Sequence, residues 1–259
     1  MTGNHPESPL RIVRDGASDP HPSANWLLAS LPPTVLAHIT PHLERVKLER
    51  KQILFRAHER LGSVYFPVTG IVSLVAGLDS GETLDVGVTG REGLVGALAL
   101  PDVSSMPCDA VVQFGGIAYR MDAGLFRQSL RNFEPLAAAV RGYAHLLLVR
   151  SMQMQVCAVF HPVEQRLTRW LLTLTDLLEG RDIALTHELL ATMLGVRRPT
   201  VTLVLGQLQR AGFVEEKRGR IVIRDRGRLE AACCPCYRWM CDQQAQILGY
   251  SCSGAAVGF

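Results

Sequence analysis

The fold of the C-terminal half is decided by Leu185–Val214, which reads LTHELLATMLGVRRPTVTLVLGQLQRAGFV. Ala191 is small where two helices would approach each other closely, and Gly195 follows at a turn where a positive φ is expected. Val201 then supplies the apolar contact that closes the helix pair. Further apolar residues recur at helical spacing and would bury the shared face: Leu189, Leu190, Met193, Leu194, Leu205 and Leu208. This pattern predicts a helix-turn-helix.

Both predicted helices have identifiable beginnings. Thr186 is a suitable N-cap for the first helix, although Leu189 at the third position means that there is no capping box. The second helix opens with a basic run and a proline: Arg197, Arg198, Pro199 and Thr200. Proline is tolerated there because the first helical turn has no intrahelical partner for its N–H. Two guanidinium groups therefore lie at the helix end that meets base edges in this motif. The alternative is an ordinary amphipathic hairpin with a solvated basic face.

A predicted β-hairpin follows the second helix directly. Residues 213–223, FVEEKRGRIVI, contain two short β-branched runs around a Lys-Arg-Gly-Arg turn, with Gly219 at the tip. A hairpin in this place is a wing, whose cations meet phosphate oxygens. Residues 181–228 carry ten Lys and Arg against five Asp and Glu, whereas residues 24–133 carry ten against ten. This local surplus of positive charge favours double-stranded DNA as the partner and predicts salt-dependent binding. The expected DNA-binding residues are Arg197, Arg198, Thr200, Thr202, Gln207, Lys217, Arg218 and Arg220.

The rest of the chain limits the possible classes of protein. Its 259 residues suit two modest domains, and 47% apolar residues are ample for their cores. We expect no membrane span and, because residues 1–16 lack an apolar segment, no secretory signal, which favours the cytoplasm. Seven cysteines, an odd number in such a chain, argue against a disulfide framework.

The front half favours β-structure. After a short amphipathic helix around Val35 and Leu36, short β-like runs alternate with glycines as far as Phe133, which is typical of an antiparallel β-barrel or jelly roll. Residues 1–23 are rich in Pro, Ser, Gly and charge and are predicted to be a disordered arm.

The apolar period changes after Pro135. Apolar residues then alternate in steps of four and three, with Arg150 intruding at one position: Leu136, Val140, Tyr143, Leu147, Met154 and Cys157. This spacing is typical of a coiled-coil seam about three heptads long, although in a monomer the same stripe would be a core-facing helix. Because a helix-turn-helix normally works as a pair, we favour a homodimer whose interface includes Leu136, Val140, Tyr143, Leu147 and Met154.

The order of barrel, long helix and winged helix resembles the Crp/Fnr family of bacterial transcription regulators over about residues 26–240. The run GVRRPTV at Gly195–Val201 is similar to the start of the family's recognition helix. The resemblance implies that Arg198 reads a guanine, while Pro199 replaces a Glu that often reads a cytosine, so we expect a different half-site. It also implies RNA polymerase as a partner and a small-molecule or redox effector whose identity the sequence leaves open. A second similar run, GREGLVG at Gly90–Gly96, corresponds to the family's effector-binding turn.

That second run departs from the cyclic-nucleotide-binding members. They hold the ribose with a Glu shortly after the last Gly and the phosphate with an Arg followed by Ser or Thr, whereas this chain has Ala97 and no Arg in residues 101–110. Without a charge-assisted contact to the phosphate, cyclic AMP binding is not expected. Arg91 and Arg120 remain possible substitutes from other strands. Glu92 is interpreted as a solvated turn residue rather than a ribose ligand.

Two groups of metal-ligating residue types need an interpretation. Cys233, Cys234, Cys236 and Cys241 lie close enough in sequence for zinc or an iron–sulfur centre, but their spacing matches no common site, so we expect structural thiols. Residues on or beside the long helix offer haem ligands, but packing roles are favoured: His145, His161, Cys157 and Met154. The sequence thus predicts no metal and no cofactor.

These observations predict an α+β protein that regulates transcription and is not an enzyme. Its expected parts are an arm (1–23), an effector-sensing β-barrel or jelly roll (24–133), a dimerisation helix (134–161), a winged helix-turn-helix (162–232) and a cysteine-containing tail (233–259). Two alternatives remain: a barrel-type sensor that acts through a protein partner, and a metal-containing redox sensor or enzyme that uses the cysteine cluster.

Overall fold

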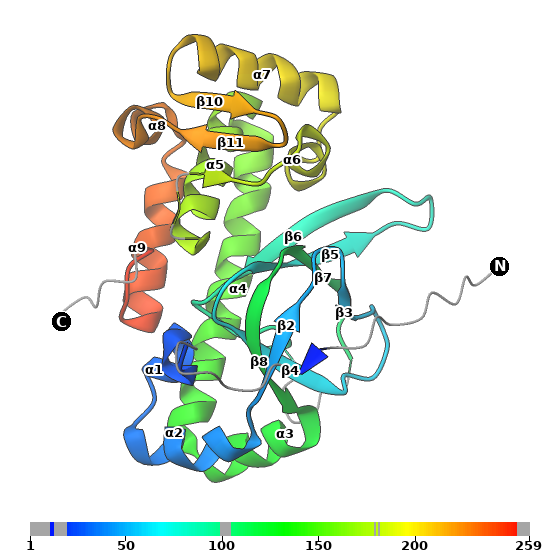
Figure 1. The fold of residues 1–259 in the computed structure, drawn as a ribbon, viewed down its shortest axis with the longest axis vertical. Helices are drawn as coiled ribbons and strands as arrows, with labels where there is room; N and C mark the ends of the chain where they lie inside the picture. The colour runs from blue at the N-terminus through cyan, green and yellow to red at the C-terminus, as the bar shows by residue number, and fades with distance from the viewer. Residues whose placement is uncertain (1–10, 13–19, 99–104, 179, 181, 253–259) are drawn as a thin grey trace. The chain divides into compact units, whose positions relative to one another are not determined.

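The computed structural model describes residues 11–12, 20–98, 105–178, 180 and 182–252, and the chain divides into two compact units (Figure 1). The first unit contains residues 1–76 and 88–144, and the second contains residues 77–87 and 145–259. The chain therefore passes between the units three times, twice in one β-hairpin and once within a long helix. The tip of that hairpin belongs with the C-terminal unit, which the sequence did not predict.

The first unit begins with helices and continues as two sheets. The short helices are η1 (Pro22–Ala24), α1 (Trp26–Ala29), α2 (Pro33–Ile39) and η2 (Thr40–His42). One sheet has the strand order β1 (Arg11–Ile12), β2 (Glu44–Leu48), β8 (Gly116–Asp122), β4 (Ser63–Pro67). The other has the order β3 (Ile53–Phe55), β7 (Asp109–Phe114), β5 (Ile71–Gly77), β6 (Thr83–Thr89). These two sheets form a jelly-roll-like domain rather than a closed barrel, followed by α3 (Ala123–Asn132), which confirms the predicted fold class.

Part of the predicted disordered arm is structured. Arg11 and Ile12 pair antiparallel with Lys47 and Val46 as an edge strand, and Pro22–Ala24 is helical. The low apolar content of the arm did not prevent strand pairing, because β2 has backbone N–H and C=O groups available at the edge of the sheet. Residues 1–10 and 13–19 of the predicted arm lie outside the described residues.

The turn at Gly90–Gly96 is fixed from both sides within the first unit. Asn25 is fully buried, and its amide donates to the carbonyl oxygens of Pro67 (2.8 Å) and Gly93 (2.9 Å). The phenol of Tyr143, also fully buried, donates a hydrogen bond to Thr89 Oγ1 at 2.9 Å. These contacts link the turn to α1 and to the first part of α4 (Glu134–Phe160).

The second unit contains the rest of α4 and a winged helix-turn-helix. After α5 (Val163–Leu178) come β9 (Asp182–Ile183), α6 (His187–Leu194), α7 (Arg198–Arg210), β10 (Val214–Lys217) and β11 (Arg220–Ile223). The strands form a small sheet in the order β10, β11, β9. Figure 1 shows α7 beside the hairpin, and α8 (Arg226–Ala232) and α9 (Cys236–Leu248) packed along α5. Among the described helices, no single one is long and apolar enough to cross a membrane; α6 and α7 meet that test only together, across a bend of 108°.

The predicted cysteine-containing tail includes a packed helix. Tyr237 on α9 donates a hydrogen bond to Asp176 on α5 at 2.7 Å, and Arg226 on α8 pairs with Asp176 at 2.8 Å. Arg226 Nη2 also donates to the Tyr237 oxygen at 2.7 Å. Burial raises the pKa of Asp176, and it raises the pKa of Tyr237 as well. This shared contact holds α8 and α9 against α5.

One pair of cysteines is bonded. Cys241 on α9 and Cys252 form a disulfide with their Cα atoms 5.2 Å apart. The sequence argued against a disulfide framework, and this one bond is a pairing that it did not anticipate. Because its sulfur is bonded to Cys252, Cys241 is not a free thiol like Cys233, Cys234 and Cys236, with which the sequence grouped it.

The contact between Gly93 and Tyr143 gives a test of this packing. A Cβ atom added at Gly93 would lie 1.8 Å from Tyr143 Cζ, so Gly93→Ala must displace the ring and lose its hydrogen bond to Thr89. We expect the free energy of unfolding to fall by about 1–3 kcal/mol, measured by urea unfolding. Gly62→Ala is the control, because nothing lies within 4 Å of the added atom. Equal losses in the two variants would show that the ring contact is unimportant.

Candidate DNA-binding site and cysteine cluster

The turn between α6 and α7 has the geometry that the sequence predicted. Thr186 Oγ1 accepts a hydrogen bond from the Leu189 N–H at 3.2 Å and caps α6. Gly195 ends α6 in the left-handed region, with φ of 62°. The next N–H, that of Val196, donates to the Ala191 carbonyl oxygen at 3.0 Å. An L side chain is strained at this φ, so glycine allows the chain to turn at once into α7.

Small and apolar side chains close the helix pair. Val201 is fully buried and Ala191 is nearly so. The two helices meet at 108°, within the range of the helix-turn-helix motif. Arg197 is the N-cap residue of α7, and Pro199 lies within its first turn. The N-terminal end of α7 therefore presents Arg197 and Arg198 to solvent.

The predicted DNA-contacting residues of α7 differ in their surroundings. The Arg198 side chain is 68% exposed and is 4.0 Å from its nearest acidic partner, Glu188. Gln207 is also exposed, whereas Thr200 is half-buried. Thr202 is exposed as a residue, but its hydroxyl contacts His187 Nδ1 at 2.9 Å and the Arg198 carbonyl oxygen at 3.2 Å. Thr202 therefore supports the start of α6 as well as lying on the exposed side of α7.

Sequence reasoning missed two residues of this surface. Leu203 is 61% exposed on α7, one turn after the exposed Pro199. Leu203 is two residues before the buried Leu205 and five before the buried Leu208. Residues on one face of a helix are three or four apart, so this spacing could have shown that Leu203 faces away from the core. His187 contacts Thr202 and also Glu216 Oε1, 2.9 Å from its Nε2, and so connects α6, α7 and the wing. No local pattern marks that role, because the three partners come from separate elements.

The wing is a hairpin with a two-residue turn. Lys217 pairs with Arg220 across the strands, and Gly219 adopts a φ of 71° at the tip, as the Lys-Arg-Gly-Arg pattern predicted. Lys217, Arg218 and Arg220 are all exposed. Arg220 Nε donates to Asp182 Oδ1 at 2.8 Å, and this hydrogen bond raises the pKa of Arg220. Arg218 lies at the tip itself.

The Gly90–Gly96 turn corrects one prediction. Glu92 is fully buried and accepts a hydrogen bond from the Gly90 N–H at 3.0 Å, so it is not a solvated turn residue. The carboxylate is buried because the turn closes over it and the neighbouring amide satisfies it. Ala97 is also buried, at 1% exposure. Residues 101–104 of the segment that lacks an arginine lie outside the described residues.

The two arginines considered as substitute phosphate ligands both have partners. Arg91 Cζ lies 5.6 Å from the centre of the Trp26 ring, over its face. Arg120 on β8 forms an ion pair with Glu44 on the neighbouring strand β2. Each cation therefore already has a favourable electrostatic contact.

The helix α4 is apolar on two faces. Most side chains of the predicted seam are buried within this single chain: Leu136, Val140, Tyr143, Leu147 and Cys157. Met154 is half-buried. A second row of apolar side chains on the same helix is exposed, with exposed fractions between 47% and 76%: Leu148, Met152, Val156, Val159 and Phe160. The sequence could not separate the two rows, because both have helical spacing.

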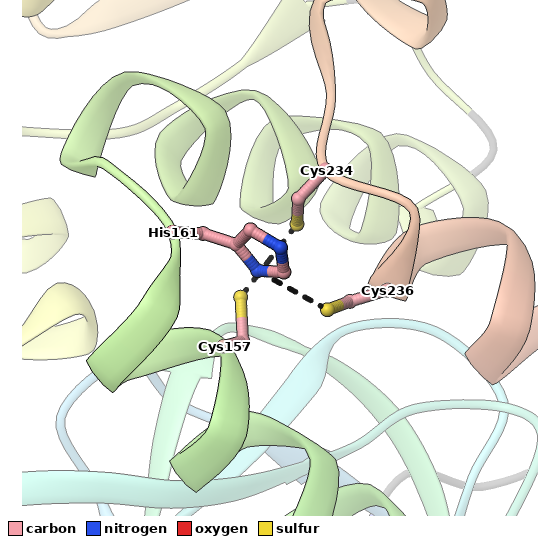
Figure 2. Close-up of side chains that lie close together, drawn as sticks. All are labelled: Cys157, His161, Cys234 and Cys236. Carbon is pink, nitrogen blue, oxygen red and sulfur yellow. Dashed lines mark hydrogen bonds between the residues drawn. The ribbon is translucent and has the colours of Figure 1, made fainter.

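The structure brings four metal-ligating side chains together in the second unit. Cys157 from α4, His161 just after it, and Cys234 and Cys236 around the start of α9 have ligand atoms that all lie within 4.8 Å of one another (Figure 2). The three thiols are at most 2% exposed and form a small buried cluster of their own. The sequence grouped Cys234 and Cys236 with their neighbours but placed Cys157 and His161 among candidate haem ligands.

Short contacts join the four side chains in pairs. The Sγ atoms of Cys157 and Cys234 are 3.6 Å apart, and Cys236 Sγ is 3.5 Å from His161 Nδ1. The hydrogen bond to Cys234, together with burial, raises the pKa of Cys157 to about 12. Without a metal, Cys157 is therefore a neutral thiol.

Comparisons with known proteins match both the N-terminal domain and the helix-turn-helix. Family models match residues 45–133 as a cyclic nucleotide-binding domain and residues 165–232 as a Crp-like helix-turn-helix domain. Together they cover more than half of the chain. A comparison with curated protein sequences finds no match.

Several solved structures share the fold. The c-di-GMP-responsive global regulator CLP from Xanthomonas campestris is 20% identical, with a TM-score of 0.62 over 75% of this chain and 100% of its own. FixK2 from Bradyrhizobium japonicum is 17% identical, with a TM-score of 0.64 over 74% and 97%. A CRP-family transcriptional regulator from Thermus thermophilus is 19% identical, with a TM-score of 0.59 over 72% and 95%.

A jelly-roll-like domain, a long helix and a winged helix-turn-helix with an exposed basic start define a DNA-binding regulator. With both domain matches, the chain belongs to the Crp/Fnr family of transcription regulators. The predicted family and DNA-binding class are therefore confirmed.

Proposed function

We propose that this protein is a homodimeric, sequence-specific regulator of transcription that reads the major groove with α7. The observation that carries the proposal is the exposed Arg198 at the start of a helix held at 108° to α6, with the cationic wing after it. A guanidinium group in this position can form two hydrogen bonds with a guanine edge. Lys217, Arg218 and Arg220 supply phosphate contacts, which orient α7 without reading the sequence.

Two exposed apolar side chains on α7 predict a further base preference in the proposed half-site. Pro199 and Leu203 are exposed and one helical turn apart. Neither side chain can donate or accept a hydrogen bond, but both can contact a thymine methyl group. We therefore expect each half-site to combine a guanine, opposite Arg198, with a neighbouring thymine.

The proposed dimer uses the exposed row on α4. Leu148, Met152, Val156 and Val159 follow one another in steps of four, four and three residues, which keeps them on one face of the helix. A row of large apolar side chains on an otherwise folded unit favours a partner surface. A second copy of α4 satisfies this row on both chains at once, as a two-fold axis requires.

The proposed signal is an effector other than cyclic AMP. Ala97 cannot accept a hydrogen bond through its side chain, and Arg91 and Arg120 already contact Trp26 and Glu44. CLP responds to c-di-GMP, so a different ligand within this fold has a precedent.

An effector that changes the register of α4 in the dimer would change the spacing of two recognition helices, which must be about 34 Å apart to enter successive major grooves. We propose that the DNA-bound dimer acts in the cytoplasm on RNA polymerase.

The first test concerns Arg198. Replacing it with Ala should weaken binding to the operator by about 1–3 kcal/mol and relax the preference at one base position in each half-site. Binding is measured by fluorescence anisotropy on operator and random duplexes over a range of salt concentrations. Arg218→Ala is the matched control: it should weaken both duplexes alike and reduce the slope of log K against log salt by about 0.9. If Arg198→Ala behaves like the control, or if wild-type binding does not depend on salt, the proposed readout is wrong.

The second test concerns the dimer. Met152→Glu places a carboxylate from each chain in the proposed apolar seam, where an unpaired charge is costly. Sedimentation velocity should show a monomer, with operator affinity reduced accordingly. Leu125→Glu, at a 40% exposed leucine on α3, is the control and should remain dimeric. A Met152→Glu protein that stays dimeric would place the interface elsewhere.

The third test concerns the effector. In titration calorimetry, cyclic AMP and cyclic GMP should give no binding heat, and neither should change the operator affinity. The physical reason is the missing charge-matched partner for a cyclic phosphate. A dissociation constant in the low micromolar range, about −8 kcal/mol, would show that the domain holds the phosphate by another route.

A further inference from the structure

We infer that Cys157, His161, Cys234 and Cys236 form a structural site for one Zn²⁺ ion, a role that goes beyond reading DNA. The four ligand atoms are three sulfurs and one imidazole nitrogen, which is one of the ligand sets of structural zinc. The inference replaces our sequence-based expectation of purely structural thiols. It does not depend on the dimer or on the effector.

The distances fit a single ion. The Cys157–Cys234 sulfur pair is 3.6 Å apart, and Cys236 Sγ and His161 Nδ1 are 3.5 Å apart. A tetrahedral ion with Zn–S bonds of about 2.3 Å has sulfur–sulfur edges of about 3.8 Å. All four ligand atoms lie within 4.8 Å of one another, so only small movements complete the tetrahedron. An iron–sulfur cluster contains several metal atoms, and the ligand atoms bound to different irons must be farther apart than those bound to one ion.

Local backbone structure holds the ligands in two pairs. Cys157 and His161 are one helical turn apart, and the His161 N–H donates to the Cys157 carbonyl oxygen at 3.1 Å. Cys234 and Cys236 are separated only by Pro235, the N-cap residue of α9. The contact between Asp176, Arg226 and Tyr237 holds the second pair against α5. The unit therefore positions both pairs before any ion binds.

Electrostatics also favour an anionic centre. Arg169 is only 4% exposed, and its Nε is buried without a hydrogen-bond partner among the described residues. Arg169 lies close enough to Cys157 and Cys233 to act on both electrostatically. When Zn²⁺ binds, three thiols release their protons to solvent, and the centre of one zinc, three thiolates and one neutral imidazole carries a net charge of −1. That charge compensates the buried guanidinium group.

A hydrogen bond from a residue outside the four ligands supports Cys236. Gln153, one turn before Cys157 on α4, donates a hydrogen bond from Nε2 to Cys236 Sγ at 3.1 Å. Donors of this kind orient a metal-bound thiolate. The ion would then join the end of α4 to the start of α9, two segments that are 77 residues apart in the sequence at Cys157 and Cys234. The site thus ties the tail to the helix that leads into the DNA-binding part.

The test uses the full-length protein. Elemental analysis should find close to one zinc per chain, and metal-free protein reloaded with Co²⁺ should show the strong visible absorption of tetrahedral cobalt with sulfur ligands. Cys236→Ser and His161→Ala should each lose stoichiometric zinc and this spectrum. Cys233→Ser is the matched control: it is a neighbouring thiol outside the four, and it should keep both. Gln153→Ala should bind zinc about tenfold more weakly, in competition with a chromophoric chelator.

Two results would overturn the inference. One is wild-type protein that binds Zn²⁺ no more tightly than Cys236→Ser does, since this comparison needs no stable ligand-free variant. The other is purified protein that contains iron and acid-labile sulfide, which would assign the cluster to redox chemistry. Operator binding is measured in parallel on the wild type: if zinc binds but the operator is not recognised, the metal site stands and the proposed regulatory function fails.

Discussion

The close contact between α6 and α7 is the constraint on which the C-terminal unit depends. Gly195 allows the chain to turn sharply at the end of α6, and the buried Ala191 and Val201 let the two helices meet at 108°. With a bulkier residue at either contact, α7 would be displaced and the basic groups at its start would point elsewhere. His187 extends the same arrangement to the wing by contacting Thr202 and Glu216. The position of α7 is therefore a consequence of packing, and packing also fixes where the charges at its start lie.

The long helix α4 serves both units through its different faces. One face is buried in its own chain, where Tyr143 packs against Gly93 and donates to Thr89. The other leaves a row of apolar side chains exposed, and the end of the helix contributes Cys157 to the cysteine cluster. One helix thus contacts the Gly90–Gly96 turn, supplies the proposed dimer surface and reaches the proposed zinc site.

The sequence predicted those structural features that depend on the local pattern of residue types. The cap at Thr186, the left-handed Gly195, the wing turn at Gly219 and the jelly-roll character of the front half all follow from spacing and residue type. It could not choose between the two apolar rows of α4, because helical periodicity does not say which face meets the core. Glu92 was misread because a carboxylate in a Gly-rich turn looks solvated until its amide partner is known. The grouping of Cys157 and His161 with Cys234 and Cys236 needed the tertiary fold.

The central claim is that two copies of α7 read DNA at a fixed spacing. The most direct test is selection of bound duplexes from a random library by the full-length protein, followed by sequencing. The account predicts an inverted repeat whose half-site centres are one helical turn apart or a multiple of it, about 10 base pairs, with a guanine in each half. Enrichment of a single unrepeated motif, or no enrichment over random sequence, would contradict it.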